Sequence, residues 1–335
     1  MNIMVTGGAG YIGSHTARLI ASSGHKPIIY DNLSSGHTWA VESSVFIQAD
    51  LADRAAIQQA LEQHQIEAVI HFAAHAYVGE SVAQPRKYFH NNVANTLNLL
   101  GAMLDVGIKH IVFSSTCAIY GIPEALPISE QHPHRPVNPY GESKLFVERV
   151  LHWYGQAYKL RWVALRYFNA AGASGDLGEC HDPETHLIPL AIRAALSGVP
   201  LSIFGTDYPT ADGTAVRDYI HVDDLAAAHL SALEYLLSGG PSRAFNLGTG
   251  QGHSVRDVIE MVEQVADLPV PQRVAERRLG DPPILVADSQ AAREILRWTS
   301  KFSLREIVES AWLWQSKLRK IQAANHLWQG PACYK

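Results

Sequence analysis

Two side chains that could move a proton stand close together in the segment NPYGESK. Tyr140 and Lys144 are four residues apart, so on a helix they lie on one face, about one turn from each other. A free tyrosine has a pKa of about 10 and is a poor base at neutral pH, but a nearby cation favours its ionised form. Lys144 could therefore make Tyr140 an acid/base group. Such a pair is common by chance, so its meaning depends on the elements that surround it.

Hydroxyl side chains precede this pair in the segment VFSSTCAIYG. Ser114, Ser115 and Thr116 follow an apolar run that is typical of a strand. Ligands of open parallel sheets bind at the carboxyl ends of strands, so we expect these hydroxyls near a reacting group. Hydrogen bonds that merely finish the strand are the alternative, above all for Ser114.

A glycine-rich turn opens the chain. Residues 7–13, GGAGYIG, follow the first expected strand and lead into the first expected helix. Glycine at 7, 10 and 13 allows a sharp turn and lets a pyrophosphate approach the N–H groups of the helix N-terminus. Asp31, at the end of the second expected strand, can accept hydrogen bonds from ribose hydroxyls and would repel a 2′-phosphate, which favours NAD over NADP. Asp50 could reach the adenine, on the weaker ground of spacing.

Short apolar runs alternate with helical patterns through the first half of the chain. We expect strands at residues 3–6, 27–30, 45–48, 68–72, 111–114 and 162–166, and helices that include residues 12–22 and 55–64. This alternation predicts an α/β fold with a doubly wound parallel sheet of the Rossmann type. From about residue 172 long Gly-, Asp- and Pro-rich loops appear, with further helices at 255–266 and 304–320. We therefore expect a cofactor domain at 1–171 and a smaller C-terminal α/β substrate domain at 172–335, some of whose segments return to the first.

The composition excludes several classes of protein. Of 335 residues, 47% are hydrophobic and 18% charged, with a net charge of −5, which is a normal globular balance. Non-specific nucleic-acid binding normally needs a basic protein, so we expect no nucleic-acid partner. No signal peptide pattern begins the chain, and no apolar run approaches the ~20 residues that span a bilayer. The sequence therefore predicts a cytoplasmic protein with no membrane partner.

The three cysteines, Cys117, Cys180 and Cys333, are far apart and indicate no disulfide framework. Cys180 and His181, with His186 nearby, could be metal ligands. A loop with incidental cysteine and histidine is the simpler interpretation, so we expect no metal.

Several motifs together resemble the extended short-chain dehydrogenase/reductase family and, within it, the UDP-glucose 4-epimerases. They are VTGGAGYIGSH, HFAAHAYVGES, FSSTCAIYG, NPYGESK, LRYFNAAG, GTAVRDYIHVDDLA and WLWQS, and they extend over nearly the whole chain. The resemblance implies bound NAD, a UDP-sugar substrate and a homodimer formed through a helix pair that includes the helix of Tyr140. Tyr140 matches the acid/base tyrosine, Lys144 the lysine that binds the nicotinamide ribose, and Thr116 the residue that hydrogen-bonds the reacting oxygen.

The expected site residues fall into two groups. Those expected to bind the cofactor are Gly7, Gly10, Tyr11, Ile12, Gly13, Asp31, Asn32, Asp50, Leu51, Phe72, Ala73, Asn91, Ser114, Tyr140, Lys144 and Tyr167. Those expected to bind the substrate are Thr116, Tyr140, Asn169, His186, Leu187, Phe204, Arg217, Tyr219, Arg278 and Asp281. The arginines suit a diphosphate, because guanidinium groups are fixed cations with forked donors.

Three positions depart from the family pattern. Ala76 replaces a lysine that many members carry near the pyrophosphate, His186 replaces the usual asparagine, and Leu285 stands where a tyrosine or a smaller residue is common. The first weakens the expectation of tightly held NAD, and the other two leave the sugar open.

The expected reaction is inversion of carbon 4 between UDP-glucose and UDP-galactose through a 4-keto intermediate, with transient hydride transfer to NAD. A UDP-pentose 4-epimerase and a net NAD-dependent oxidoreductase on a nucleotide sugar are the alternatives. A dehydratase is disfavoured, because Cys117 and Ala118 stand where dehydratases carry an Asp–Glu pair, and neither can do the acid/base work of eliminating water.

Overall fold

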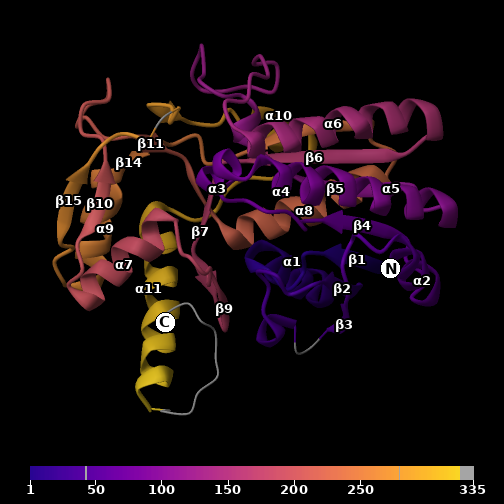
Figure 1. Cartoon of the computed structure of the whole chain (residues 1–335), viewed down its shortest axis with the longest axis horizontal. Coiled ribbons are helices and arrows are strands. Elements are labelled where there is room, and N and C mark those ends of the chain that lie inside the picture. Colours follow the sequence, from indigo (N-terminus) through magenta and orange to yellow (C-terminus); the bar gives the residue numbers. More distant parts are fainter. Residues whose placement is uncertain (42–43, 279, 325–335) are drawn as a thin grey trace.

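A seven-stranded parallel sheet forms the centre of the computed structural model, which describes residues 1–41, 44–278 and 280–324 (Figure 1). Its strand order is β13-β6-β5-β4-β1-β2-β3. The strands are β1 (Asn2–Thr6), β2 (Lys26–Asp31), β3 (Val45–Gln48), β4 (Ala68–His71), β5 (His110–Thr116), β6 (Arg161–Tyr167) and β13 (Arg243–Leu247). The order changes direction between β1 and β4, which is where open α/β sheets bind their ligands. The predicted doubly wound fold is confirmed, with each predicted strand in place to within two residues at either end.

Helices cover both faces of this sheet (Figure 1). On one face α1 (Tyr11–Ser22) packs against α8 (Val222–Leu237). On the other lie α2 (Arg54–Gln63), α5 (Asn95–Val106) and α6 (Pro139–Tyr158). Alternate residues of one strand supply the two hydrophobic cores, because successive side chains of a strand point to opposite faces. Ile3 and Val5 belong to the first core and Met4 to the second.

The remaining elements after β6 form a smaller layer around a third core (Figure 1). Its helices are α7 (Leu187–Ser197), α9 (Val255–Ala266) and α11 (Leu304–Ala324), with α10 (Gln290–Ile295) beside β13. The short strands pair as β10 (Leu201–Phe204) with β15 (Gln272–Ala275), β12 (Tyr219–His221) with β7 (Asn169–Ala171), β8 (Ala173–Ser174) with β9 (Leu177–Gly178), and β11 (Val216–Arg217) with both β14 (His253–Ser254) and β16 (Ile284–Leu285).

Short helical turns complete the first half of the chain. They are α3 (Val78–Ala83), α4 (Pro85–Tyr88), a π-helical segment (Phe89–Ala94) and two 3-10 turns (Thr38–Val41 and Cys117–Ile119). Within the described part of the chain, no helix combines the length and the apolar character needed to cross a membrane.

The glycine turn brings three backbone segments into contact. Gly7 has a φ of +70°, and a Cβ atom placed there would lie 2.5 Å from the backbone nitrogen of Ala73. A Cβ atom on Gly13 would lie 2.3 Å from the carbonyl oxygen of Gly7. The first turn of α1 can therefore sit directly above β1 and the segment after β4 only because these positions lack side chains.

A buried ion pair fixes α6 on the sheet. The Arg166 guanidinium on β6 donates from Nη2 to Glu148 Oε2 at 2.6 Å and from Nε to Glu148 Oε1 at 3.0 Å. The hydroxyl of Ser115, on β5, donates to the same Oε1 at 2.5 Å. Both charged side chains are only 6% exposed, so each depends on its partner for stabilisation.

Replacing Glu148 by alanine should lower the free energy of unfolding by about 3–5 kcal/mol, because it leaves a buried guanidinium without its counter-charge. Urea denaturation measures the loss. The matched control is Glu124→Ala, which breaks the exposed pair with Arg135 and should cost about 0–1 kcal/mol. Equal losses in the two variants would contradict this assignment.

Replacing Gly7 by alanine should destabilise the protein more than replacing Gly24. Both glycines have positive φ, but a Cβ on Gly24 would meet nothing within 4 Å. Gly24→Ala should cost about 1–2 kcal/mol through backbone strain alone. Gly7→Ala adds the contact with the Ala73 backbone and should cost about 1–3 kcal/mol more. Denaturation curves of the two variants test the difference, and a Gly7→Ala protein as stable as Gly24→Ala would refute the close approach.

Candidate active site

Tyr140, Lys144 and Thr116 lie where α6 begins and β5 ends. Asn138 caps the helix by accepting a hydrogen bond from the backbone nitrogen of Gly141 at 2.9 Å. Tyr140 is in the first turn, and the Lys144 ammonium donates to the carbonyl oxygen of Ser114, on β5, at 2.8 Å. Thr116 is the last residue of β5, where its hydroxyl accepts from Ala118 N at 3.1 Å. The start of α6 is thus held over the carboxyl end of β5.

Burial controls the ionisation of this group. It raises the pKa of Tyr140 above its ordinary value; Tyr167 acts in the same direction and contact with the Thr116 hydroxyl opposes it. Burial also lowers the pKa of Lys144 to about 7, against the influence of Glu148. The lowering of the tyrosine pKa by Lys144 and the positive nicotinamide stays a prediction for the protein with its cofactor bound. Without the cofactor, the Lys144 ammonium is directed at a backbone carbonyl, and the lost hydration of the phenolate dominates the pKa of Tyr140.

Ser114 and Tyr167 form a second pair of hydroxyls beside this group. Their oxygen atoms are in short hydrogen-bond contact between neighbouring strands β5 and β6. Burial raises the pKa of Tyr167 to about 12, and the bond to Ser114 opposes that shift. Tyr167 is therefore a neutral hydrogen-bonding group at the same edge of the sheet.

The glycine turn and the ends of β2 and β4 form a cradle suited to a dinucleotide. Gly10 is the N-cap of α1, and no side chain among the described residues caps this helix terminus, so its N–H groups suit a pyrophosphate. Asp31 accepts from Ala9 N at 3.0 Å and Leu33 N at 2.8 Å. Its carboxylate has further lone pairs for ribose hydroxyls. These features fit the NAD that the sequence predicts.

Other expected cofactor residues surround this cradle. Phe72 and Ala73 follow β4 directly, and their backbone lies against Gly7. The Asn32 amide donates to Asp50 Oδ2 at 2.7 Å, which joins the segments after β2 and β3. Leu51 is buried next to Asp50.

Two more expected cofactor residues lie on helical segments. Tyr11 begins α1, followed by Ile12 and Gly13, and its hydroxyl donates to the carbonyl oxygen of Gly172 at 2.5 Å. Asn91 lies in the π-helical segment, where its amide donates to Asn92 Oδ1 at 3.0 Å.

The residues expected to hold UDP are brought together in three contacts. Arg217, on β11, is paired with Asp281. The guanidinium carbon of Arg278 lies 4.1 Å from the centre of the Phe204 ring. The third contact is between neighbouring strands, because β12 pairs with β7 so that Tyr219 lies beside Asn169.

His186 and Leu187 stand at the start of α7, where His186 is the N-cap residue. The His186 ring nitrogen Nδ1 is in short contact with Glu179 Oε1, and His181 lies next to both. Burial opposes ionisation of Glu179, yet the two imidazoles lower its pKa to about 2. Burial likewise disfavours a charged His181, but Glu179 and Glu184 raise its pKa to about 10. The sequence analysis singled out both histidines but not Glu179 or Glu184, because carboxylates are common in loops. Of the three cysteines considered there, Cys333 lies outside the described residues.

The other two residues that depart from the family pattern, Leu285 and Ala76, lie in different surroundings. Leu285, on β16, is 9% exposed and packs in a cluster with Cys117, Phe168 and Ala287. Ala76 lies in the loop between β4 and α3.

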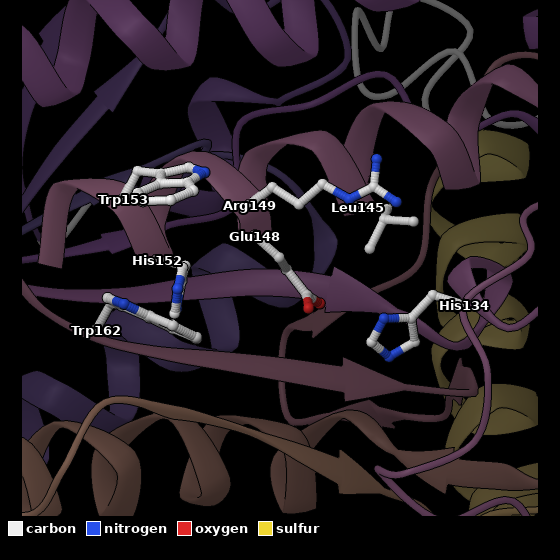
Figure 2. Close-up of a pocket in the computed structure, with 7 residues that line it drawn as sticks. All are labelled: His134, Leu145, Glu148, Arg149, His152, Trp153 and Trp162. Carbon is white, nitrogen blue, oxygen red and sulfur yellow. The ribbon is translucent and has the colours of Figure 1, made fainter. Parts of the chain in front are cut away.

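Figure 2 shows a separate hollow of about 200 Å³ beside α6. It is lined by His134, Leu145, Glu148, Arg149, His152, Trp153 and Trp162. These are not the residues expected at the active site, so this hollow is separate from the predicted site.

Comparisons with known proteins support the same assignment as this geometry. The sequence profile described as "NAD dependent epimerase/dehydratase family" matches residues 3–248. A Rhizobium meliloti protein named UDP-glucose 4-epimerase is 51% identical over 319 residues, which are 94% of this chain and 97% of that protein. A Halalkalibacterium halodurans protein of the same name is 50% identical over 321 residues, 95% of this chain and 96% of that protein.

Solved structures match equally well. The Brucella ovis UDP-glucose 4-epimerase in complex with NAD has a TM-score of 0.91 and 49% identity, covering 93% of this chain and 97% of that one. The Bifidobacterium longum UDP-glucose 4-epimerase with NAD+ and UDP has a TM-score of 0.91 and 36% identity, covering 95% and 98%. The chain therefore belongs to the NAD-dependent epimerase/dehydratase family.

Proposed function

We propose that this chain is an NAD-dependent UDP-glucose 4-epimerase, which inverts carbon 4 of UDP-glucose and UDP-galactose through a 4-keto intermediate. The observation that carries the proposal is the meeting of Tyr140, Thr116 and Lys144 at the carboxyl end of β5. This is one strand away from β4, whose end contacts the glycine turn. Relatives that are 45–51% identical over most of this chain carry the same activity in their names.

The mechanism follows from these side chains. NAD, when bound, supplies a reversible hydride acceptor for carbon 4 of the sugar. Tyr140 takes the proton from the 4-hydroxyl and later returns it, while the Thr116 hydroxyl holds the reacting oxygen. Because burial favours neutral Tyr140, the ammonium of Lys144 is needed to stabilise the phenolate, which must be present before Tyr140 can take the proton of the 4-hydroxyl.

The UDP part provides the anchor. Arg217 and Arg278 supply two cations for the diphosphate. Asp281, which pairs with Arg217, keeps that guanidinium in place. Asn169, His186, Leu187, Phe204 and Tyr219 complete the proposed UDP site. Holding the substrate by its nucleotide leaves the sugar free to turn over, so that carbon 4 can be reduced on its other face.

A UDP-pentose 4-epimerase is the second candidate. The solved structure of a UDP-glucose-4-epimerase from Stenotrophomonas maltophila, with bound NAD and formylated UDP-arabinopyranose, is 40% identical to this chain and has a TM-score of 0.93. It covers 96% of this chain and 99% of that one. Leu285, on the expected wall of the sugar pocket, favours a sugar of moderate size over an N-acetylhexosamine.

We also propose the domain division and the assembly. Residues 1–171 supply the NAD-binding domain, and residues 172–335 mainly the UDP-sugar domain.

The homodimer forms through α5 and α6, where apolar side chains are exposed: Leu97 by 37%, Phe146 by 45% and Trp153 by 65%. Exposed apolar side chains of this size are typical of surfaces that other protein chains cover. A cytoplasmic location stays a prediction.

Replacing Tyr140 by phenylalanine should lower kcat by roughly 10²–10⁴-fold, because the group that carries the proton is lost. Proton NMR of reactions with UDP-galactose, UDP-N-acetylgalactosamine and UDP-xylose, with nothing else added, measures turnover and identifies the sugar. Tyr158→Phe is the control on the same helix, since Tyr158 is 51% exposed, and it should keep full activity. Near-wild-type turnover by the Tyr140 variant would exclude the acid/base role, and lasting NADH accumulation would favour a net oxidoreductase.

Changing Phe146 and Trp153 together to glutamate should convert the homodimer to a monomer, because four charges would face one another across the interface. Light scattering after size-exclusion chromatography measures the mass, which should fall from two chains to one. Val199→Glu is the control, an exposed apolar residue just after α7 (66% exposed). If the double variant kept the mass of the wild-type protein, α6 would not be the interface.

A further inference from the structure

Four potential metal ligands meet in the loop between β9 and α7. They are Glu179, His181, Glu184 and His186, and one ligand atom from each lies within 4.8 Å of all the others. The two glutamate side chains are nearly buried, at 5% and 8% exposed, while His181 is 20% and His186 46% exposed. The glutamates are paired with the histidines as they stand, but two imidazoles and two carboxylates that converge in this way are also the ligand types that hold a divalent cation.

His181 lies against both carboxylates of this cluster. Its Nδ1 atom is shielded from solvent and lies 3.0 Å from Glu179 Oε1 and 3.7 Å from Glu184 Oε2. At these distances Nδ1 still has no hydrogen-bond partner among the described residues. A cation between these atoms would use the Nδ1 lone pair and both carboxylates at once.

Contacts outside the cluster hold the two glutamates in place. Glu184 Oε1 accepts from the backbone nitrogens of Thr185 and His186, at 2.7 and 2.8 Å. Its Oε2 atom is the one directed toward His181. The backbone of Glu179 is also held, because its carbonyl oxygen accepts from Trp314 Nε1 at 3.1 Å. Ligands oriented by such outer contacts are a regular feature of metal sites.

We propose that Glu179, His181, Glu184 and His186 bind a divalent transition-metal cation of the Zn²⁺ class. Two imidazole nitrogens and two carboxylate oxygens suit Zn²⁺, whose ligands lie about 2.0–2.2 Å from the ion. Two carboxylates also balance its double charge. The sequence analysis expected no metal in this loop because it considered only Cys180 and the two histidines as ligands. Glu179 and Glu184 add two carboxylate ligands to the histidines.

The cation has a structural role in this proposal. The His181 ring stacks edge-on against Tyr11 at 6.3 Å and Tyr77 at 6.0 Å between ring centres. Tyr11 begins the helix after the glycine turn, and His186 is the N-cap of α7. One bound ion would therefore tie the start of α1 to the start of α7, the two helix ends expected to face NAD and UDP.

The test is metal binding by untagged protein stripped with a chelator, with no nucleotide sugar added. Calorimetric titration with Zn²⁺ should show about one site per chain. Co²⁺ in place of Zn²⁺ should give the visible absorption of a four-coordinate ion with nitrogen and oxygen ligands, and Zn²⁺ should raise the melting temperature. No saturable binding by the wild-type protein would overturn the proposal without any variant.

Glu179→Gln and Glu184→Gln keep the shape of the side chains and remove a charge, and each should weaken Zn²⁺ binding at least tenfold. Asp176→Asn is the matched control, a carboxylate in the adjacent β8–β9 hairpin that is 81% exposed; it should bind Zn²⁺ like the wild type. Circular dichroism confirms that each variant is folded. Undiminished binding by both glutamine variants would place the ion elsewhere and refute the site.

Discussion

A single buried carboxylate, that of Glu148, sets the position of the proposed acid/base group. It accepts hydrogen bonds from Arg166 on β6 and Ser115 on β5, while its own helix carries Lys144 about one turn earlier and Tyr140 about two turns earlier. Arg166 also donates to the hydroxyl of Tyr120, which donates to Asn246 on β13. One network therefore links α6 to three neighbouring strands. The side chains that we propose to react are held by an ion pair that has no part in the proposed reaction.

Burial has opposite effects on the pKa values of the two reacting groups, and both effects favour neutral forms. The pKa of Tyr140 is raised and that of Lys144 is lowered to about 7. The phenolate form of Tyr140 is therefore stabilised only by positive charge that arrives with the ligands, or by Lys144 when it keeps its own proton. Perturbed groups of this kind are typical of active sites. The acid/base capacity depends on what fills the site as well as on the tyrosine–lysine spacing.

The sequence was sufficient for the features set by local patterns. The strand–helix alternation predicted the order of elements up to β6, and the glycine turn with Asp31 predicted the cradle. It could not show that β13 joins the sheet, because that depends on long-range pairing with β6. The pairing of Arg217 with Asp281 is equally invisible along the chain. The burial that raises the pKa of Tyr140 could not be predicted either, because spacing reveals a neighbouring charge and does not reveal how much water is lost.

The place of β13 at the end of the sheet affects how the protein is made on the ribosome. Until residues 243–247 have been synthesised, β6 is an edge strand with unpaired N–H and C=O groups. The face of the sheet that α8 covers is also bare until residues 222–237 emerge. A nascent chain that ends at residue 171 therefore lacks both the strand that pairs with β6 and the helix that covers this face, and exposed edges of this kind favour aggregation. The seven-stranded sheet is therefore complete only when the chain has been made as far as residue 247.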